Sequence, residues 1–394
     1  MVLQISPYES IDFDFAISRA PGTALINSYV IRKALIRKHF LSATVETWLA
    51  KHPESVLSTH VKRSEAFELD FAEFLDDALV EAWDLRASLG RNEARGDSER
   101  MEWWILKPSM SDRGQGIRLF STMEQLQGIF DEWEEGMSDM EGDDEDGDGR
   151  EIGDDDESGG GATDGHLGDG DGHIMASHLR HFVVQPYIDP PLLLPELDSR
   201  KFHIRVYVLA VGSMRVFVYR DMLALFSAKP YQAPRLTDCN SDGNDDAVVD
   251  LDAHLTNTCL QGNDIAAKAG SVRRFWELPL PQETRDKVFE QICAVTGDVF
   301  EAAARGMMVH FQPLECAFDV YGLDFLVDAQ GTAWLLEVNA FPDFKQTGDL
   351  QDLVAGFWQD TLHITVAPLV GGGRGGDASD RMVLVRDIDL GRRS

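Results

Sequence analysis

The sequence predicts an α+β protein in which antiparallel hairpins stand beside amphipathic helices. Two segments, residues 200–221 and 321–342, each show an alternating strand pattern, a short turn with a glycine and a second strand pattern. Helical periodicity appears in separate stretches, among them residues 281–305. The chain has 394 residues, a length that favours two or three lobes.

The first third of the chain mixes helix and strand patterns. Ser121 is expected to begin a helix that runs to about Trp133, because Glu124 follows three residues later in a capping-box pattern. The elements expected before this helix are, in order, a basic amphipathic helix at residues 27–40, an acidic helix at 67–89, and strands at 101–106 and 117–120.

Residues 136–176 are rich in Gly, Asp, Glu and Ser and almost devoid of apolar side chains. Such a segment cannot bury enough surface to order itself, so we predict a disordered insertion. Asp144, Asp146, Asp148 and Asp155 fall at the spacing of a calcium-binding loop. Because the flanks are not helical and the last ligand is Asp rather than Glu, we interpret the segment as a solvated run of charge.

The charge and the cysteines exclude several kinds of partner and site. The net charge is −32, and residues 139–171 hold fifteen acidic residues and one basic residue, a net of −14. The remaining −18 would still repel nucleic acid and anionic membranes, so we expect neither as a direct partner. No long apolar run or signal-peptide pattern is present. Four cysteines without CxxC spacing argue against a zinc site or a disulfide framework and favour a reducing cytosol.

The second half of the chain resumes with a strand pattern at residues 181–188. The two hairpins follow, separated by a polar insertion at residues 236–252 and by the helix at 281–305. A glycine-rich linker at residues 371–376 then leads to a last expected strand at 381–388.

The hairpin at residues 321–342 brings two carboxylates together. If its turn closes symmetrically, Asp328 pairs with Ala333 and Asp324 lies opposite Glu337. Facing carboxylates cost up to about 1 kcal/mol, which a divalent cation would remove, and hard oxygen ligands suit Mg²⁺. The alternative is an exposed polar face. The other face is expected to be wholly apolar and carries Leu323, Phe325, Val327, Trp334, Leu336 and Val338.

Two arginines are expected to face each other on the hairpin at residues 200–221. A turn centred on residues 212–213 would place Arg205 opposite Arg220, which is destabilising unless an anion lies between them. The alternative is a pair of solvated arginines. The polar face of the first strand carries Lys201, His203, Arg205 and Tyr207.

Two further segments carry weaker signals. Lys107 leaves a strand and enters a loop in which Gly114 and Gly116 would let backbone amides approach a phosphate closely. An ordinary hairpin loop is the alternative. Residues 254–257 (HLTN) are polar around one leucine and alone would be a turn or a helix cap.

Together these segments resemble the tubulin-tyrosine-ligase family of ATP-grasp enzymes over residues 27–348, both in the sequences of the motifs and in their order along the chain. KPSMSDRGQGI resembles the family's phosphate loop, VVQPYI its adenine-binding hinge and RKFHIRVYV its RKFDIR strand. YRD at residues 219–221 matches the strand that bears a second arginine. HLTN and LLEVNAFP are similar to the family's own HLTN and to its metal-binding strand.

The resemblance implies the ATP-grasp fold, with two α+β lobes whose antiparallel sheets enclose ATP. It divides the chain into a short N-terminal segment (1–26), a first lobe that contains the acidic insertion (27–188), a second lobe (189–370), and a linker with a C-terminal strand (371–394).

The resemblance also implies a role for each matching residue, with ATP and Mg²⁺ as cofactors. Arg205 and Arg220 would be catalytic and stabilise an acylphosphate, and His254 would contact the acceptor substrate. The implied ATP-binding residues are Lys107, Gly114, Gly116, Gln185, Tyr187, Ile188, Lys201, His203, Thr256 and Asn257. The implied Mg²⁺ ligands are Asp324, Glu337 and Asn339.

The function implied is an ATP-dependent carboxylate–amine ligase with an unidentified acceptor. His203 departs from the family pattern, which has Asp in RKFDIR, and only 26 residues precede the basic helix. The amino-acid sequence is most similar to fungal members associated with P-bodies. Those members carry an upstream phosphatase-like domain, so we expect the sequence to be either a fragment or a shorter form. The alternative function is a nucleotide-binding module that docks a cytoplasmic protein complex, such as mRNA-decapping factors, with little or no ligase activity.

Overall fold

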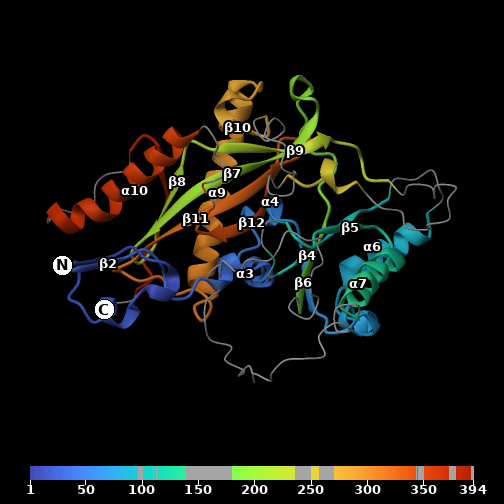
Figure 1. The fold of residues 1–394 in the computed structure, drawn as a ribbon, viewed down its shortest axis with the longest axis horizontal. Helices are drawn as coiled ribbons and strands as arrows, with labels where there is room; N and C mark the ends of the chain where they lie inside the picture. The colour runs from blue at the N-terminus through green and yellow to red at the C-terminus, as the bar shows by residue number, and fades with distance from the viewer. Residues whose placement is uncertain are drawn as a thin grey trace, which may run out of the picture.

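The computed structural model describes residues 1–95, 101–109, 111, 114–138, 180–235, 250–256, 270–342, 344, 350–371 and 379–391. Two antiparallel sheets of different size dominate this part of the chain, and helices pack against both (Figure 1). Within it, no helix combines the length and the apolar character needed to cross a membrane.

The large sheet has the strand order β10-β9-β7-β11-β12, and β8 pairs with both β7 and β13. Its strands are β7 (Arg200–Val211), β8 (Arg215–Tyr219), β9 (Leu223–Pro230), β10 (Val272–Arg274), β11 (Phe318–Val327), β12 (Ala333–Ala340) and β13 (Met382–Asp387). The small sheet has the order β3-β6-β4-β5, with β3 (Glu65–Glu68), β4 (Trp104–Pro108), β5 (Arg118–Phe120) and β6 (His181–Pro186). A separate parallel pair is formed by β1 (Val2–Gln4) and β2 (Ala24–Ile26).

Helices cover both faces of the large sheet (Figure 1). Along β7, Ile204 and Val206 pack into a core shared with α9 (Gln282–Gly306), and Tyr207 and Leu209 pack into a core shared with α10 (Gln351–Gly371). Because both faces are covered, β7 and β11 are buried along most of their length, and this burial includes the polar residues Lys201, His203 and Asp324.

The small sheet is covered on one face by α6 (Trp83–Glu93) and α7 (Met123–Ser138). Alternation along β4 sends Trp104 and Leu106 into this core and leaves Ile105 and Lys107 on the opposite face. That opposite face forms one wall of the cleft described below.

The N-terminal residues belong to the core of the large sheet. Buried residues between Ile11 and Leu57 join the cluster that contains β7 and α9, whereas the small sheet has a separate core between Phe67 and Val184. The helices in this region are α1 (Phe13–Ile17), α2 (Lys33–Ile36), α3 (Lys38–Lys51) and α4 (Leu57–His60). The lobe boundaries expected from the sequence instead place residues 27–57 in the first lobe (27–188), together with the small sheet.

The single helix expected at residues 27–40 is wrong. The chain forms α2 and α3, which are separated by extended backbone at Arg37, and residues 27–32 are not helical. The reason is a buried ion pair, in which Arg32 Nη1 lies 3.3 Å from Asp319 Oδ1 and donates to Ser28 Oγ. This long-range contact fixes the segment in a shape that helical periodicity does not reveal.

The helix expected at residues 67–89 is also wrong. Its start lies in β3, which pairs with β6, and only α5 (Leu75–Ala78) and α6 are α-helical within it. Phe67 packs against Phe182 and Phe130, so tertiary contacts override the helical propensity of the acidic stretch.

Other expected elements are confirmed with small shifts. The helix at residues 281–305 is α9, and the strand at 381–388 is β13. The N-cap of helix α7 is Thr122, one residue later than expected, because the backbone N–H of Gln125 donates to Thr122 Oγ1. The helix continues to Ser138. The remainder of the acidic insertion, with its calcium-loop spacing, and most of the polar insertion at 236–252 and of the linker at 371–376 lie outside the described residues.

Candidate functional site

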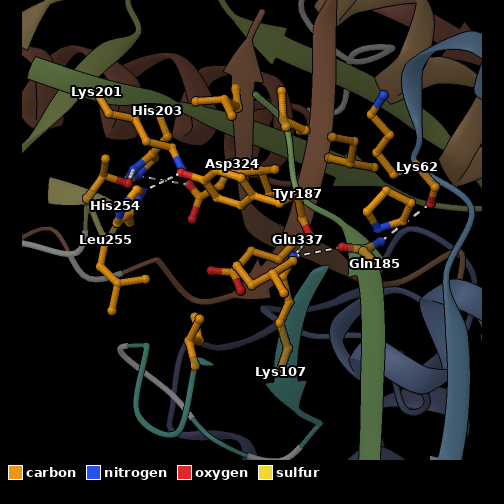
Figure 2. Close-up of a pocket in the computed structure, with 18 residues that line it drawn as sticks. Lys62, Lys107, Gln185, Tyr187, Lys201, His203, His254, Leu255, Asp324 and Glu337 are labelled. Atoms are coloured by element: carbon orange, nitrogen blue, oxygen red, sulfur yellow. Dashed lines mark hydrogen bonds and ion pairs between the residues drawn. The ribbon is translucent and has the colours of Figure 1, made fainter. Parts of the chain in front are cut away.

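A cleft lies between the free face of the small sheet and the large sheet (Figure 2), and the space within it, including the part open to solvent, measures about 770 Å³. β4 and β6 form one wall, and β7, β11 and β12 form the other. Ten of the residues that the sequence singled out line it, namely Lys107, Gln185, Tyr187, Ile188, Lys201, His203, His254, Thr256, Asp324 and Glu337.

Two buried ammonium groups project into the cleft from opposite walls. Lys107 Nζ donates to Gln185 Oε1 at 2.8 Å, and Lys201 Nζ donates to Tyr187 Oη at 2.8 Å. Among the described residues neither lysine forms an ion pair. Burial lowers the pKa of Lys107 to about 8, and burial together with Lys107 lowers the pKa of Lys201 to about 7. A bound anion would stabilise the charged form of both ammonium groups.

Two carboxylates face each other across β11 and β12, as the sequence predicted, since Asp324 is the cross-strand partner of Glu337. Burial and the facing carboxylate raise the pKa of Asp324. Glu337 is also buried in part, but Lys38, 3.8 Å away, and the Asn339 amide, 3.1 Å away, hold its pKa below the usual range. The site therefore combines one firmly ionised carboxylate with one that a cation would help to ionise.

The pairing of Asp324 with Glu337 arises through a β-bulge. Next to the turn, Val327 pairs with Ala333, so the symmetric turn expected from the sequence is wrong by one residue. The register shifts between Asp324 and Phe325, and Leu336 is the extra residue on β12.

The bulge also corrects the expected apolar face. Leu335, 3% exposed, packs into the core, whereas its neighbours Trp334 and Leu336 are only half-buried. Strict alternation from Trp334 to Val338 therefore predicted the wrong side for Trp334 and Leu336, because an inserted residue reverses the pattern.

The predicted pair of facing arginines is wrong. The pairing between β7 and β8 runs from Val211 to Val208 and then stops, and β9 takes the place beside Arg205. Arg205 instead makes a bidentate ion pair with Asp324, with distances of 2.5 Å from Nε to Oδ1 and 3.1 Å from Nη2 to Oδ2. Arg220 lies outside the cleft lining, with its guanidinium stacked over Trp276 and Phe289.

The residues that follow β6 form an apolar part of the cleft wall. Tyr187 is held there by a backbone hydrogen bond to the Trp103 carbonyl at 2.8 Å, and Ile188 follows it. The cleft also has aliphatic lining that the sequence did not single out, contributed by Ile105, Ile117, Leu255, Leu326, Leu335 and Leu336. Flat aliphatic surfaces beside backbone polar groups suit a heteroaromatic ring.

Two neutral histidines complete the wall formed by β7 and the 254–256 segment. Tyr187 Oη lies 2.9 Å from His254 Nδ1, and His203 Nδ1 lies 2.6 Å from Thr256 Oγ1. Burial lowers the pKa of His254 to about 4 and that of His203 to about 3.

The remaining predicted site residues lie around the cleft or outside the described chain. Asn339 reaches the site through its hydrogen bond to Glu337. Gly114 and Gly116 have positive φ values of 79° and 71°, as a tight loop requires, but neither lines the cleft. Asn257 lies outside the described residues.

Lys62 is a cleft residue that the sequence did not reveal. Its Nζ lies 3.5 Å from the centre of the Trp334 ring in β12, and this cation–π contact lies beside the cleft. No motif surrounds it, and only the folded chain brings it to the site.

The donor set fits a magnesium–nucleotide complex. Two ammonium groups are available for phosphates, and two carboxylates with one amide offer the oxygen ligands that Mg²⁺ prefers. In the part of the chain that the structure describes, no group of three or more His, Cys, Asp and Glu forms a preformed metal centre. Phosphate oxygens would therefore have to supply part of the coordination.

Two antiparallel sheets that enclose a cleft with buried lysines and facing carboxylates define an ATP-grasp protein. The fold agrees with that of a solved structure, the C-terminal domain from K. lactis Pby1, described as an ATP-grasp enzyme interacting with the mRNA decapping enzyme Dcp2. The two share 36% sequence identity with a TM-score of 0.66, over 98% of this chain and 88% of that one.

Within that class, the chain belongs to the tubulin-tyrosine ligase family, which it matches over residues 18–370. It is 46% identical to the Saccharomyces cerevisiae protein named Probable tubulin--tyrosine ligase PBY1, over 93% of this chain but only 46% of that relative's length. It is 43% identical to the Schizosaccharomyces pombe protein named Probable tubulin--tyrosine ligase C12B10.04, over 98% of this chain and 88% of that protein. The family resemblance drawn from the sequence is confirmed.

Proposed function

We propose that the chain binds Mg-ATP in the cleft and uses it to activate a carboxylate for ligation to an amine. One observation carries the proposal: two buried ammonium groups without ion-pair partners in the described chain share one cleft with the facing carboxylates Asp324 and Glu337. Phosphates would neutralise the lysines, and a divalent cation would add to the positive charge that Arg205 and Lys38 already present to the carboxylates. Family membership supports the same reading.

The cleft suggests how each wall would act. The phosphates would lie between Lys107 and Lys201, and the adenine ring would lie against Gln185, Tyr187 and Ile188. Asp324, Glu337 and Asn339 would hold Mg²⁺, which would neutralise phosphate charge when bound.

In the proposed reaction, a carboxylate oxygen of the substrate attacks the γ-phosphorus of ATP, ADP leaves, and an acylphosphate forms. An amine then attacks the acyl carbon, phosphate leaves with the bonding electron pair, and the amine loses a proton to give the amide. Arg205 also lies outside the cleft lining and its guanidinium is paired with Asp324, so it would act by holding this carboxylate and would reach the phosphoryl oxygens only if the ion pair opened. The position of Arg220 does not support an equivalent role.

The acceptor and the partner are proposed on similarity. The names of the fungal relatives point to tubulin, but the acidic composition of this chain favours another acceptor. The related K. lactis domain is described as interacting with Dcp2, so we propose mRNA-decapping factors as partners and a cytoplasmic, P-body setting.

A substrate-dependent ATPase screen over amino acids and cytosolic peptides tests the ligase proposal. We expect release of ADP and phosphate only when an acceptor is present, and no release from the Glu337→Gln variant. Partner binding that survives the Glu337→Gln substitution, with no ATP turnover under any condition, would support a docking module instead.

A further inference from the structure

His39, in the first turn of α3, forms two hydrogen bonds with Ser109, which directly follows β4. The backbone N–H of His39 donates to Ser109 Oγ at 3.1 Å, and His39 Nδ1 lies 2.6 Å from the same oxygen. Among the described residues, no other group accepts a hydrogen bond from this hydroxyl, so we assign its proton to the bond with Nδ1. Each residue is then both donor and acceptor to the other.

The Ser109 hydroxyl also serves as the cap of α3. Arg37, the N-cap residue of this helix, makes no side-chain hydrogen bond to the first turn. Ser109 Oγ instead accepts the N–H of the second helical residue, which is the bond that an N-cap serine usually makes. The helix therefore receives its cap from a residue that lies far away in the sequence.

This contact joins the two parts of the molecule that have separate cores. Helix α3 packs into a large-sheet core through Leu41 and Val45. Ser109 belongs to the small sheet, where its backbone N–H donates to the His181 carbonyl of β6 at 2.8 Å. The His39 ring also stacks on the His181 ring, with 4.5 Å between their centres and 17° between their planes.

Residues beside this contact belong to the proposed nucleotide site. Lys107 precedes Ser109 by two positions. On the helix, Lys38 Nζ donates to the Ser111 carbonyl at 2.9 Å and lies 3.8 Å from Glu337 Oε2. A shift of α3 against the chain that follows β4 would therefore move Lys107 relative to Glu337.

We propose that His39 is a positioning residue, whose hydrogen bonds with Ser109 hold Lys107 and Glu337 at the separation that Mg-ATP requires. His39 does not line the cleft, so it acts through Ser109 and does not touch the ligand. The proposal rests on the proposed function, because it assumes that Mg-ATP binds between these walls. Burial and the neighbouring His181 lower the pKa of His39 to about 4, so at neutral pH the ring is uncharged and can accept at Nδ1.

Calorimetric titration of Mg-ATP into two His39 variants of the full chain tests the proposal. His39→Asn keeps an acceptor, because the side-chain Oδ1 can take the place of Nδ1, whereas His39→Leu removes it. We expect His39→Leu to bind Mg-ATP about tenfold more weakly than the wild type, the upper range for one lost hydrogen bond, and His39→Asn to bind within about twofold of it.

Two further substitutions separate positioning from general stability. Ser109→Ala removes the partner hydroxyl with little change of size, so it should lose at least as much affinity whether or not His39→Leu folds. The double variant should lose no more than Ser109→Ala, since both changes remove one contact. Val45→Ala weakens the packing of α3 without touching Ser109 and should bind Mg-ATP as the wild type does, while urea denaturation records its lower stability.

Three results would overturn the proposal and leave the proposed function standing. These are wild-type affinity in His39→Leu, an equal loss in His39→Asn, and an equal loss in Val45→Ala, which would show that any weakening of α3 lowers the affinity. Failure of the wild type to bind Mg-ATP would reject the proposed function, and this proposal with it.

Discussion

Lys107 and Lys201 are the residues on which the proposed nucleotide binding would depend most. Each lysine is more than nine-tenths buried, and among the described residues its ammonium group donates to neutral oxygens, Gln185 Oε1 and the Leu336 carbonyl for Lys107 and Tyr187 Oη for Lys201. A buried charge without a counter-ion is costly, and the lowered pKa values of both lysines reflect that cost. Functional sites are where such costs are usually found, because the ligand removes them.

Proton uptake on ATP binding should include contributions from both lysines, and a variant of Lys107 separates its share. With a pKa of about 8 in the free protein, roughly half of the Lys107 side chains are neutral at pH 8. Bound phosphates favour the charged form and raise this pKa, so binding takes protons up. Calorimetry at pH 8 in buffers of different ionisation enthalpy measures the uptake.

Lys107→Arg is the matched control, because arginine keeps its charge at this pH. The variant should take up roughly half a proton less than the wild type. Equal uptake by both proteins would contradict the role of Lys107 as the titrating phosphate ligand.

At this scale the sequence identified most of the cleft. Alternation along β7 correctly placed Lys201 and His203 on one face, because side-chain direction in a regular strand depends only on position. Lys62 and the ion pair between Arg205 and Asp324 were not predicted. Both depend on contacts between segments far apart in the chain, which local patterns do not contain.

At the scale of elements, the close approach of β11 to the end of β12 shapes the proposed cation site. Gly322 pairs with Asn339 across the two strands. An ideal Cβ at Gly322 would lie 2.8 Å from Pro342 Cβ and 3.3 Å from Arg205 Cδ. Glycine therefore lets Arg205 lie across β11 to reach Asp324, and lets the chain after Asn339 fold back over the sheet.

Gly322→Ala should destabilise the protein and loosen the Arg205–Asp324 ion pair. Overpacking at a buried position costs about 1–3 kcal/mol of the free energy of unfolding. Urea denaturation followed by tryptophan fluorescence measures the change.

Gly128→Ala in α7 is the control, because it should raise the free energy of unfolding rather than lower it. No atom lies within 4 Å of an added Cβ there, and alanine is favoured over glycine in a helix by about 1 kcal/mol. A Gly322→Ala variant as stable as the wild type would show that the strands can separate without cost.

Elements set by local pairing were easier to predict than elements set by distant contacts. Both hairpins and α9 were expected correctly, although each hairpin register was off by one residue near its turn. The bulge at Leu336 then restored the pairing of Asp324 with Glu337. The helices expected at residues 27–40 and 67–89 failed, because a buried ion pair and an added sheet strand decide those segments.

At the scale of the whole molecule, the cleft lies between two sheets that do not share a core. In the described chain the small sheet buries one cluster and the large sheet buries two, one on each face, and the cleft residues come from both sheets. Such an arrangement would allow the lobes to move relative to each other as the proposed nucleotide enters and leaves.

The overall charge argues against tubulin as the acceptor. The chain has 36 basic and 68 acidic residues, whereas an acidic tubulin tail would require a positive groove. We predict that the purified chain binds Mg-ATP but does not add tyrosine to detyrosinated tubulin. Radiolabelled tyrosine on tubulin above the level given by a Glu337→Gln control would refute this prediction.

Calorimetric titration of Mg-ATP into the wild type and into Glu337→Gln tests the central claim that the carboxylate pair and the lysines of this cleft bind a magnesium–nucleotide complex. The substitution removes charge but not shape, so the variant should keep its fold by circular dichroism and lose at least about 100-fold in affinity, or about 2.7 kcal/mol. Glu196→Gln, at an exposed position outside the cleft, should bind as the wild type does. No binding by the wild type, or equal affinity in the wild type and in Glu337→Gln, would contradict the claim.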